Sequence, residues 1–293
     1  MKILLTGTSG KVGGALAQDW KFTRPDDDII PLTRSTVDLS DSIALENYLQ
    51  QTDFDLLVNP AALSTPEACE DNHELAIAVN VDAPKVMAQV CKEKGARLIH
   101  FSTDYVLCGK EPDFKTEKSP TRPNNHYGAT KLAGEEQVLA ACENALVARV
   151  SWVFATAGEA FLEKILRLLK EEAPLEAVAD KYSMPTSAPE LFRMIDFLLE
   201  KEASGLFHLT QTADEPISWY RYACEVVAAA HELELISEAV PVTPRKMDDI
   251  PVLRTGRPRH TSMQPERLQN LEHPIKPWTE ALRDQVTRTN QNI

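Results

Sequence analysis

The chain of 293 residues lacks the features that mark several large classes of protein. Its five cysteines form no Cys-x-x-Cys pair, so the sequence indicates neither a disulfide framework nor a cysteine metal site. No apolar run reaches the roughly 18 residues of a membrane span, and the N-terminus shows no signal-peptide pattern. The seven histidines have neither His-x-His nor His-Glu-x-x-His spacing, so no metal is expected. We expect a cytoplasmic protein that does not bind membranes.

Positive charge is also in short supply. The net charge of -13 argues against general binding to nucleic acid or to anionic membranes, although it leaves room for a local basic pocket. The hydrophobic content of 43% is enough for one large domain or two modest ones.

The first half of the chain alternates short apolar runs with longer helical patterns, which indicates an α/β protein with a Rossmann-like, doubly wound parallel sheet. The expected strands are residues 2–6, 28–33, 55–62, 97–103 and 145–154, and the expected helices are 12–20, 41–51, 74–95 and 128–143.

The pattern loosens after about residue 155. We predict an NAD(P)-binding Rossmann domain over residues 1–155, which also takes back a segment around 185–210. Residues 156–293 are expected to form mainly a smaller, C-terminal substrate-binding domain. It should contain helices at 160–172, 187–202 and 217–233 and a strand at 205–210, with a segment over 240–278 that is rich in proline and arginine and leads into "KPWTEALRDQV".

A glycine-rich turn follows the first expected strand, in "TGTSGKVGG". Gly7, Gly10 and Gly13 would let backbone amides and the helix N-terminus approach a pyrophosphate, although any tight strand–helix turn favours glycine. At this position in a βαβ pattern we predict a dinucleotide site, with Ser9, Lys11 and Val12 as further contacts.

The end of the second strand indicates which dinucleotide is bound. An acidic residue there would favour NAD, whereas this chain has Thr33 and Arg34, and an arginine suits the 2′-phosphate of NADP. We expect NADPH, with NADH possible; the alternative is that Arg34 is a solvated surface residue. Asp38 and Leu39 are expected near the adenine, unless Asp38 only opens the next helix.

Two later motifs carry the chemistry. "FSTDYV" ends the fourth strand, and "YGATKLAGE" places Tyr127 and Lys131 one helical turn apart. A lysine ammonium near a phenol lowers its pKa and makes it a general acid–base, and Ser102 or Thr103 could align a substrate oxygen. With hydride from a dinucleotide, this set predicts reduction of a carbonyl to an alcohol.

These ordered motifs, together with "VNPAA", "AVNVDAP", "RVSWVF" and "RPRHTSMQPERL", resemble the extended short-chain dehydrogenase/reductases, and most closely the dTDP-4-dehydrorhamnose reductase family. The resemblance implies reduction of a nucleotide-linked 4-keto-6-deoxysugar with NADPH or NADH, with Tyr127 as proton donor. It implies three sets of residues: Thr103, Tyr127 and Lys131 for catalysis; Thr103, Asp104, Tyr105, Tyr127 and Trp152 for the sugar nucleotide; and Ala61, Ala62, Asn80, Ser102, Tyr127 and Lys131 for the cofactor.

Some segments depart from the family pattern. "NPAALST" replaces "NAAAYT", and "DKYSMPT" replaces "DQxGxPT", with Ser183 where glycine is usual. The glutamate that some relatives use for a magnesium-bridged dimer is missing after Gly13, so a monomer and a homodimer both remain open. Arg257, which lies with Arg254 and Arg259 in "LRTGRPRH", is predicted to bind the substrate diphosphate, the alternative being a solvated loop.

Two other functions remain open. The same fold resembles the regulatory subunit of methionine adenosyltransferase, a non-catalytic protein that binds NADP and has similar motifs. An epimerase or dehydratase fits less well, because dehydratases usually read "TDE" where Tyr105 follows Asp104 here.

Overall fold

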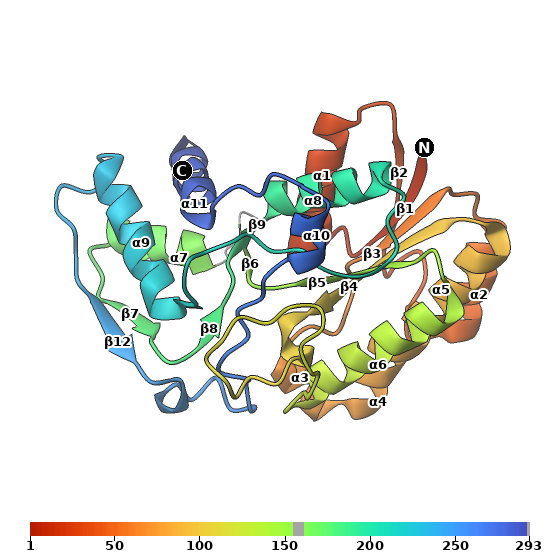
Figure 1. Ribbon diagram of the computed structural model, residues 1–293, viewed down its shortest axis with the longest axis horizontal. Helices are drawn as coiled ribbons and strands as arrows, with labels where there is room; N and C mark the ends of the chain where they lie inside the picture. Colours follow the sequence, from red (N-terminus) through yellow and green to blue (C-terminus); the bar gives the residue numbers. More distant parts are fainter. Residues whose placement is uncertain (155–160, 292–293) are drawn as a thin grey trace.

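Parallel strands form the central sheet of the computed structural model, which describes residues 1–154 and 161–291 (Figure 1). The strand order is β2-β1-β3-β4-β5-β10, and all neighbouring strands are parallel. The order reverses between β1 and β3, which places a ligand crevice at the carboxyl ends of these strands. The predicted fold class is confirmed. The strands are β1 Lys2–Thr6, β2 Asp28–Leu32, β3 Leu56–Asn59, β4 Arg97–Thr103, β5 Leu146–Val150 and β10 Gly205–His208.

Helices cover both faces of this sheet. Successive residues of a strand point to opposite faces, and apolar side chains on each face are buried under helices. Ile3 and Leu5 pack with helices α1 and α8 on one face, whereas Leu4 packs with α2, α5 and α6 on the other. Trp20 of α1 meets Phe192 of α8 edge to face, with ring centroids 5.3 Å apart. The bounds are α1 Lys11–Thr23, α8 Ala188–Glu200, α2 Ser42–Gln51, α5 Ala83–Lys94 and α6 His126–Ala141.

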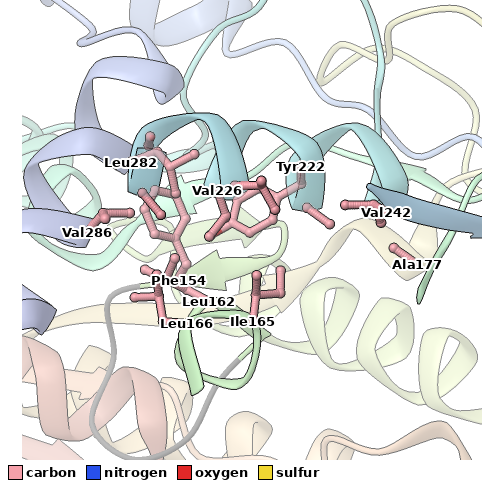
Figure 2. Packing of buried hydrophobic residues seen from close by; sticks show 14 of the residues in the cluster. Phe154, Leu162, Ile165, Leu166, Ala177, Tyr222, Val226, Val242, Leu282 and Val286 are labelled. Atoms are coloured by element: carbon pink, nitrogen blue, oxygen red, sulfur yellow. The ribbon is translucent and has the colours of Figure 1, made fainter. Parts of the chain in front are cut away.

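A separate hydrophobic cluster lies beside the sheet and contains none of its strands (Figure 2). Tyr222 and Val226 of α9 pack on Leu162 and Ile165 of α7, with Leu282 of α11 closing the cluster. Its elements are α7 Phe161–Lys170, α9 Trp219–Glu232, α11 Trp278–Gln291 and the parallel pair β7 Leu175–Val178 and β12 Val242–Arg245. α8 and β10 return to the sheet layer. The predicted division of the chain near residue 155 stays a prediction, because residues 155–160 lie outside the described part.

Short elements complete the chain. β6 pairs with β9 and β8 with β11, and these pairs link the sheet layer to the second cluster. They are β6 Val153–Phe154, β8 Tyr182–Ser183, β9 Thr186–Ser187, β11 Ile217–Ser218, α3 Pro66–Asp71, α4 His73–Ile77, the π-helix η1 Ala78–Asp82, the 3₁₀ turns η2 Asp104–Val106 and η3 Met247–Asp249, and α10 Glu266–Asn270. No helix in the described ranges is long and apolar enough to cross a membrane.

Two predicted elements differ most from the structure, and the strand expected over 55–62 is shorter, ending at Asn59. The strand expected over 145–154 ends at Val150, because Trp152 takes a left-handed backbone conformation with φ of 39° that no strand can accommodate. The single helix expected over 74–95 is made of α4, η1 and α5 in succession. It ends as predicted at Gly95, with φ of 68°.

Candidate active site

The turn between β1 and α1, where the phosphate site is predicted, is tight and depends on glycine. Gly7 has φ of 61°, and a Cβ at Gly13 would lie 2.3 Å from the Gly7 carbonyl oxygen, so a side chain there would push the turn apart. Gly10 caps α1 without a side-chain hydrogen bond, and no acidic residue lies in the first turn. The start of α1 therefore carries no side-chain cap and no acidic side chain that would repel an anion, as the binding of a dinucleotide requires.

The predicted adenosine end is exposed. Thr33, Ser35 and Thr36 hydrogen bond to one another through their hydroxyls, while Arg34 is exposed with no hydrogen bond or ion pair among the described residues. Asp38 accepts hydrogen bonds from the amide and hydroxyl of Ser40, which lower the pKa of its carboxyl. Arg34 is thus free to meet a 2′-phosphate, whereas the Asp38 carboxylate already has partners.

Tyr127 and Thr103 come together at the carboxyl end of β4. The Asn125 side chain caps α6 by accepting from the Gly128 amide at 2.8 Å, which fixes the start of the helix. A Cβ at Gly128 would lie 2.4 Å from the carbonyl oxygen of Tyr105, so glycine lets α6 approach η2 closely. This approach brings the phenol of Tyr127 near the Thr103 hydroxyl, close enough for that hydroxyl to lower the pKa of the phenol.

The ionisation of Tyr127 differs from the expectation. Burial raises the pKa of its phenol above the ordinary value, Asp104 and Cys69 add to this, and the hydrogen bond with Thr103 opposes it. The predicted lowering by Lys131 is not found, since Lys131 is not among the groups that shift the pKa of Tyr127. Spacing on one helix face did not reveal that the lysine ammonium has another partner.

That partner is His100, in a buried chain of polar groups. Lys131 Nζ lies 3.4 Å from His100 Nε2, and His100 Nδ1 lies 3.1 Å from Asn59 Nδ2. Asn59 Oδ1 accepts from the Thr6 hydroxyl at 2.7 Å, and this hydroxyl accepts from the Ala61 amide at 3.2 Å. Burial lowers the pKa of Lys131 to about 8, and burial with Lys131 nearby lowers the pKa of His100 far below its usual range. These hydrogen-bonded groups link β1, which leads into the glycine turn, to helix α6.

A second polar group holds the loop after β3. Asn80, fully buried in η1, accepts from the Leu63 amide at 2.9 Å and donates to the Thr130 hydroxyl at 3.1 Å. Ala61 borders the glycine turn, since a Cβ at Gly7 would lie 3.3 Å from its Cα. The Ser102 hydroxyl is buried without a partner in the described residues. These positions are consistent with the cofactor side predicted for them.

The predicted substrate side is aromatic. Tyr105 meets the Tyr127 ring at 5.6 Å, and Trp152 packs against Tyr222 at 4.6 Å and against Trp219 at 5.6 Å. The strained backbone of Trp152 is of the kind that often occurs at functional sites. Its binding role stays a prediction.

The arginines of "LRTGRPRH" already have carboxylate partners. Arg257 makes a bidentate pair with Glu67 at 2.6 and 3.0 Å, Arg254 pairs with Asp71, and Arg259 pairs with Asp180 and Asp248. Binding of a diphosphate by Arg257 stays a prediction, and it requires this arginine to share its guanidinium with Glu67. In the described ranges, no group of three or more His, Cys, Asp or Glu side chains could hold a metal ion.

Known proteins resemble this chain over its whole length. A family model described as "RmlD substrate binding domain" matches residues 1–291. A dTDP-4-dehydrorhamnose reductase of Burkholderia thailandensis is 35% identical over 238 residues, which is 78% of each chain. The Escherichia coli dTDP-4-dehydrorhamnose reductase is 31% identical over 285 residues, covering 92% of this chain and 91% of the relative. The chain belongs to the dTDP-4-dehydrorhamnose reductase family.

Solved structures of the family agree with this assignment. The Bacillus anthracis dTDP-4-dehydrorhamnose reductase in complex with NADP matches with a TM-score of 0.88 at 26% identity, over 98% of this chain and 99% of that one. The Clostridium acetobutylicum structure gives 0.89 at 27% identity, over 99% and 100%. The predicted enzyme class, an NAD(P)-dependent oxidoreductase of a sugar-nucleotide carbonyl, is the class of this family.

Sequence reasoning missed several residues around the site. His100, Thr6 and Lys181 are buried polar residues that no motif singled out, and Glu67 is the partner of Arg257. A charged or polar residue inside an apolar strand, such as His100 in "RLIHFST", was the one available signal.

Proposed function

We propose that this protein reduces the 4-keto group of dTDP-4-keto-6-deoxy-L-mannose with NADPH. The observation that carries the proposal is the approach of Tyr127 to Thr103 at the end of β4, in a sheet whose first strand leads into a glycine turn at the start of α1. Membership of the reductase family supports the sugar-nucleotide substrate.

The chain's own residues would orient the substrate and deliver a proton. A bound nicotinamide would supply the hydride. The raised pKa keeps the Tyr127 phenol protonated at neutral pH, so the phenol has a proton to give to the carbonyl oxygen. Thr103 would hydrogen bond to that oxygen, and Lys131, mostly protonated below its pKa of about 8, would bind the cofactor ribose.

The preference for NADPH is supported by Arg34, whose exposed guanidinium makes no hydrogen bond or ion pair in the described residues, although its charge acts on Asp38, and by the NADP bound to the Bacillus anthracis relative. A guanidinium binds a phosphate through paired, charge-assisted hydrogen bonds.

The test is to mix the protein with NADPH and dTDP-4-keto-6-deoxy-L-mannose and to follow nicotinamide absorbance. Tyr127→Phe should lower kcat by about 100-fold or more, the usual contribution of a positioned acid. Tyr48→Phe is the matched control, because it removes a phenol hydroxyl from α2, which packs on one face of the sheet. This variant should retain activity. Absence of turnover by the wild type, or full turnover by Tyr127→Phe, would contradict the proposal.

The regulatory alternative predicts a different result. A non-catalytic NADP-binding subunit would bind NADPH without turnover. It would also co-elute in size-exclusion chromatography with the methionine adenosyltransferase that it regulates. Steady turnover with no co-elution would exclude it. The same column run determines whether the protein is a monomer or a homodimer.

A further inference from the structure

A fully buried lysine lies behind the proposed active site. Lys181, which precedes β8, has no exposed surface, although burying an ammonium is costly unless it is paired and hydrogen bonded. Its Nζ donates to Thr261 Oγ1 at 2.7 Å, to Ser183 Oγ at 2.9 Å and to the Tyr182 carbonyl at 3.1 Å. These acceptors use all the protons of the ammonium.

The negative charge that balances Lys181 belongs to Asp104. Asp104 Oδ2 lies 3.9 Å from Lys181 Nζ, and the Thr261 hydroxyl bridges the two by accepting from the ammonium and donating to the carboxylate. Asp104 is only 4% exposed, so water screens this pair little. Arg257 is a further cation near Lys181, the Tyr105 ring lies 5.4 Å from Nζ, and His260 stacks on Tyr182.

The other oxygen of Asp104 reaches the catalytic hydroxyl. Thr103 Oγ1 donates to Asp104 Oδ1 at 3.2 Å. A hydroxyl has a single proton, so Thr103 cannot donate to Asp104 and to a substrate oxygen at the same time. To donate to a substrate oxygen, Thr103 must withdraw its proton from Asp104.

We propose that Lys181 is a positioning residue for the Thr103 hydroxyl, acting through Thr261 and Asp104. The ammonium shares the charge of Asp104 and weakens it as an acceptor, so that Thr103 can turn its proton to the substrate. Without the ammonium, Asp104 becomes an uncompensated buried carboxylate and holds the Thr103 proton more tightly. This inference rests on the proposed reductase function, in which Thr103 orients the substrate carbonyl.

A double-mutant cycle with Thr103→Val tests the inference. Lys181→Gln keeps polar contacts to Thr261 and Ser183 but removes the charge, and it should lower kcat about tenfold, the size of one lost hydrogen bond in the transition state. In the Thr103→Val background the same change should alter kcat less than about twofold, because the residue through which Lys181 acts is gone. The KM for NADPH should stay unchanged.

Lys118→Gln, which removes an exposed lysine paired with Glu266, is the control and should leave kcat unchanged. A full tenfold loss in both backgrounds, as a merely structural role would give, overturns the inference. So does an unchanged kcat for Lys181→Gln with Thr103 present.

A second measurement needs no turnover. If the wild type does not reduce the substrate, the proposed function fails. The pairing of Lys181 with Asp104 can still be tested by NMR titration of lysine labelled with ¹³C at Cε. Asp104→Asn should lower the pKa of Lys181, because the carboxylate that favours its charged form is lost. An unchanged pKa overturns the inference whatever the enzyme does.

Discussion

Lys131 Nζ lies 3.4 Å from His100 Nε2, inside the protein and away from solvent. Both residues are almost fully buried, and His100 also contacts Asn59, whose amide oxygen accepts from Thr6. His100 therefore joins the residue expected to hold the cofactor ribose to the strand that leads into the glycine turn.

Replacing His100 should weaken the buried polar contacts on both of its sides, toward Lys131 and toward Asn59. His100→Leu removes the ring nitrogens that contact Asn59 Nδ2 and Lys131 Nζ, so we expect the free energy of unfolding to fall by about 1–3 kcal/mol. We also expect the KM for NADPH to rise. Urea unfolding and steady-state kinetics would measure the two effects. The exposed His231 of α9 offers a matched control, His231→Leu, which should change neither quantity. Unaltered stability in His100→Leu would show that the buried polar groups around His100 contribute little to the free energy of unfolding.

The glycine turn should tolerate no side chain at Gly13. Gly13→Ala puts a Cβ 2.3 Å from the Gly7 carbonyl oxygen, and the backbone must move to relieve this clash. We expect NADPH binding, measured by isothermal titration, to weaken by at least about tenfold, because displaced amides lose their hydrogen bonds to phosphate. At Gly256 the nearest atom would lie 3.5 Å from a new Cβ, so Gly256→Ala should bind NADPH as the wild type does. Equal affinity in the two variants would contradict the predicted phosphate site.

The sheet and the glycine turn could be predicted because each leaves a local mark in the sequence. The segment "KILLT" is a continuous apolar run without alternating polar residues, which indicates a strand buried on both faces. In the structure, side chains of β1 are buried on both faces of the sheet. Tyr127 and Lys131 were recognised by spacing, and the structure places Tyr127 near Thr103.

The rest could not be predicted because it depends on contacts between distant segments. Lys181 meets Asp104 and Thr261 across 77 and 80 positions of the chain, respectively, and no local pattern records such a meeting. The predicted lowering of the Tyr127 pKa by Lys131 was wrong for the same reason. The Lys131 ammonium lies beside His100, which comes from strand β4 and not from the helix that carries Tyr127 and Lys131. The short strands of the second half are too brief for periodicity to show.

Arg34 should decide between the two dinucleotides. Arg34→Ala removes an exposed guanidinium without disturbing a contact that the described residues make, so stability should not change. We expect the KM for NADPH to rise about tenfold and the KM for NADH to change much less, since a hydrogen bond to a charged group contributes roughly 1.5–3 kcal/mol. Lys85→Ala removes an exposed charge on α5 and controls for net charge. A parallel rise for both dinucleotides would show that Arg34 does not contact the 2′-phosphate.

Acid should destabilise the protein through its buried histidines. His208 is fully buried, its Nδ1 donates to the Gln264 carbonyl at 3.1 Å, and burial with Arg149 nearby lowers its pKa to about 3. Below pH about 6.5 the unfolded chain binds a proton at this histidine and the folded chain does not, so the stability present above that pH is lost as the pH falls. The slope is at most about 1.4 kcal/mol per pH unit for each such histidine.

Urea unfolding between pH 7 and pH 5 would measure this loss, in a range where most carboxylates remain ionised. His208→Asn keeps a donor near the Gln264 carbonyl but cannot titrate, so its free energy of unfolding should fall less steeply with acid than that of the wild type. His231→Asn removes an exposed histidine of α9, and it should leave the slope unchanged. A wild-type slope retained in His208→Asn would mean that His208 takes up its proton in the folded protein, against the burial that surrounds it.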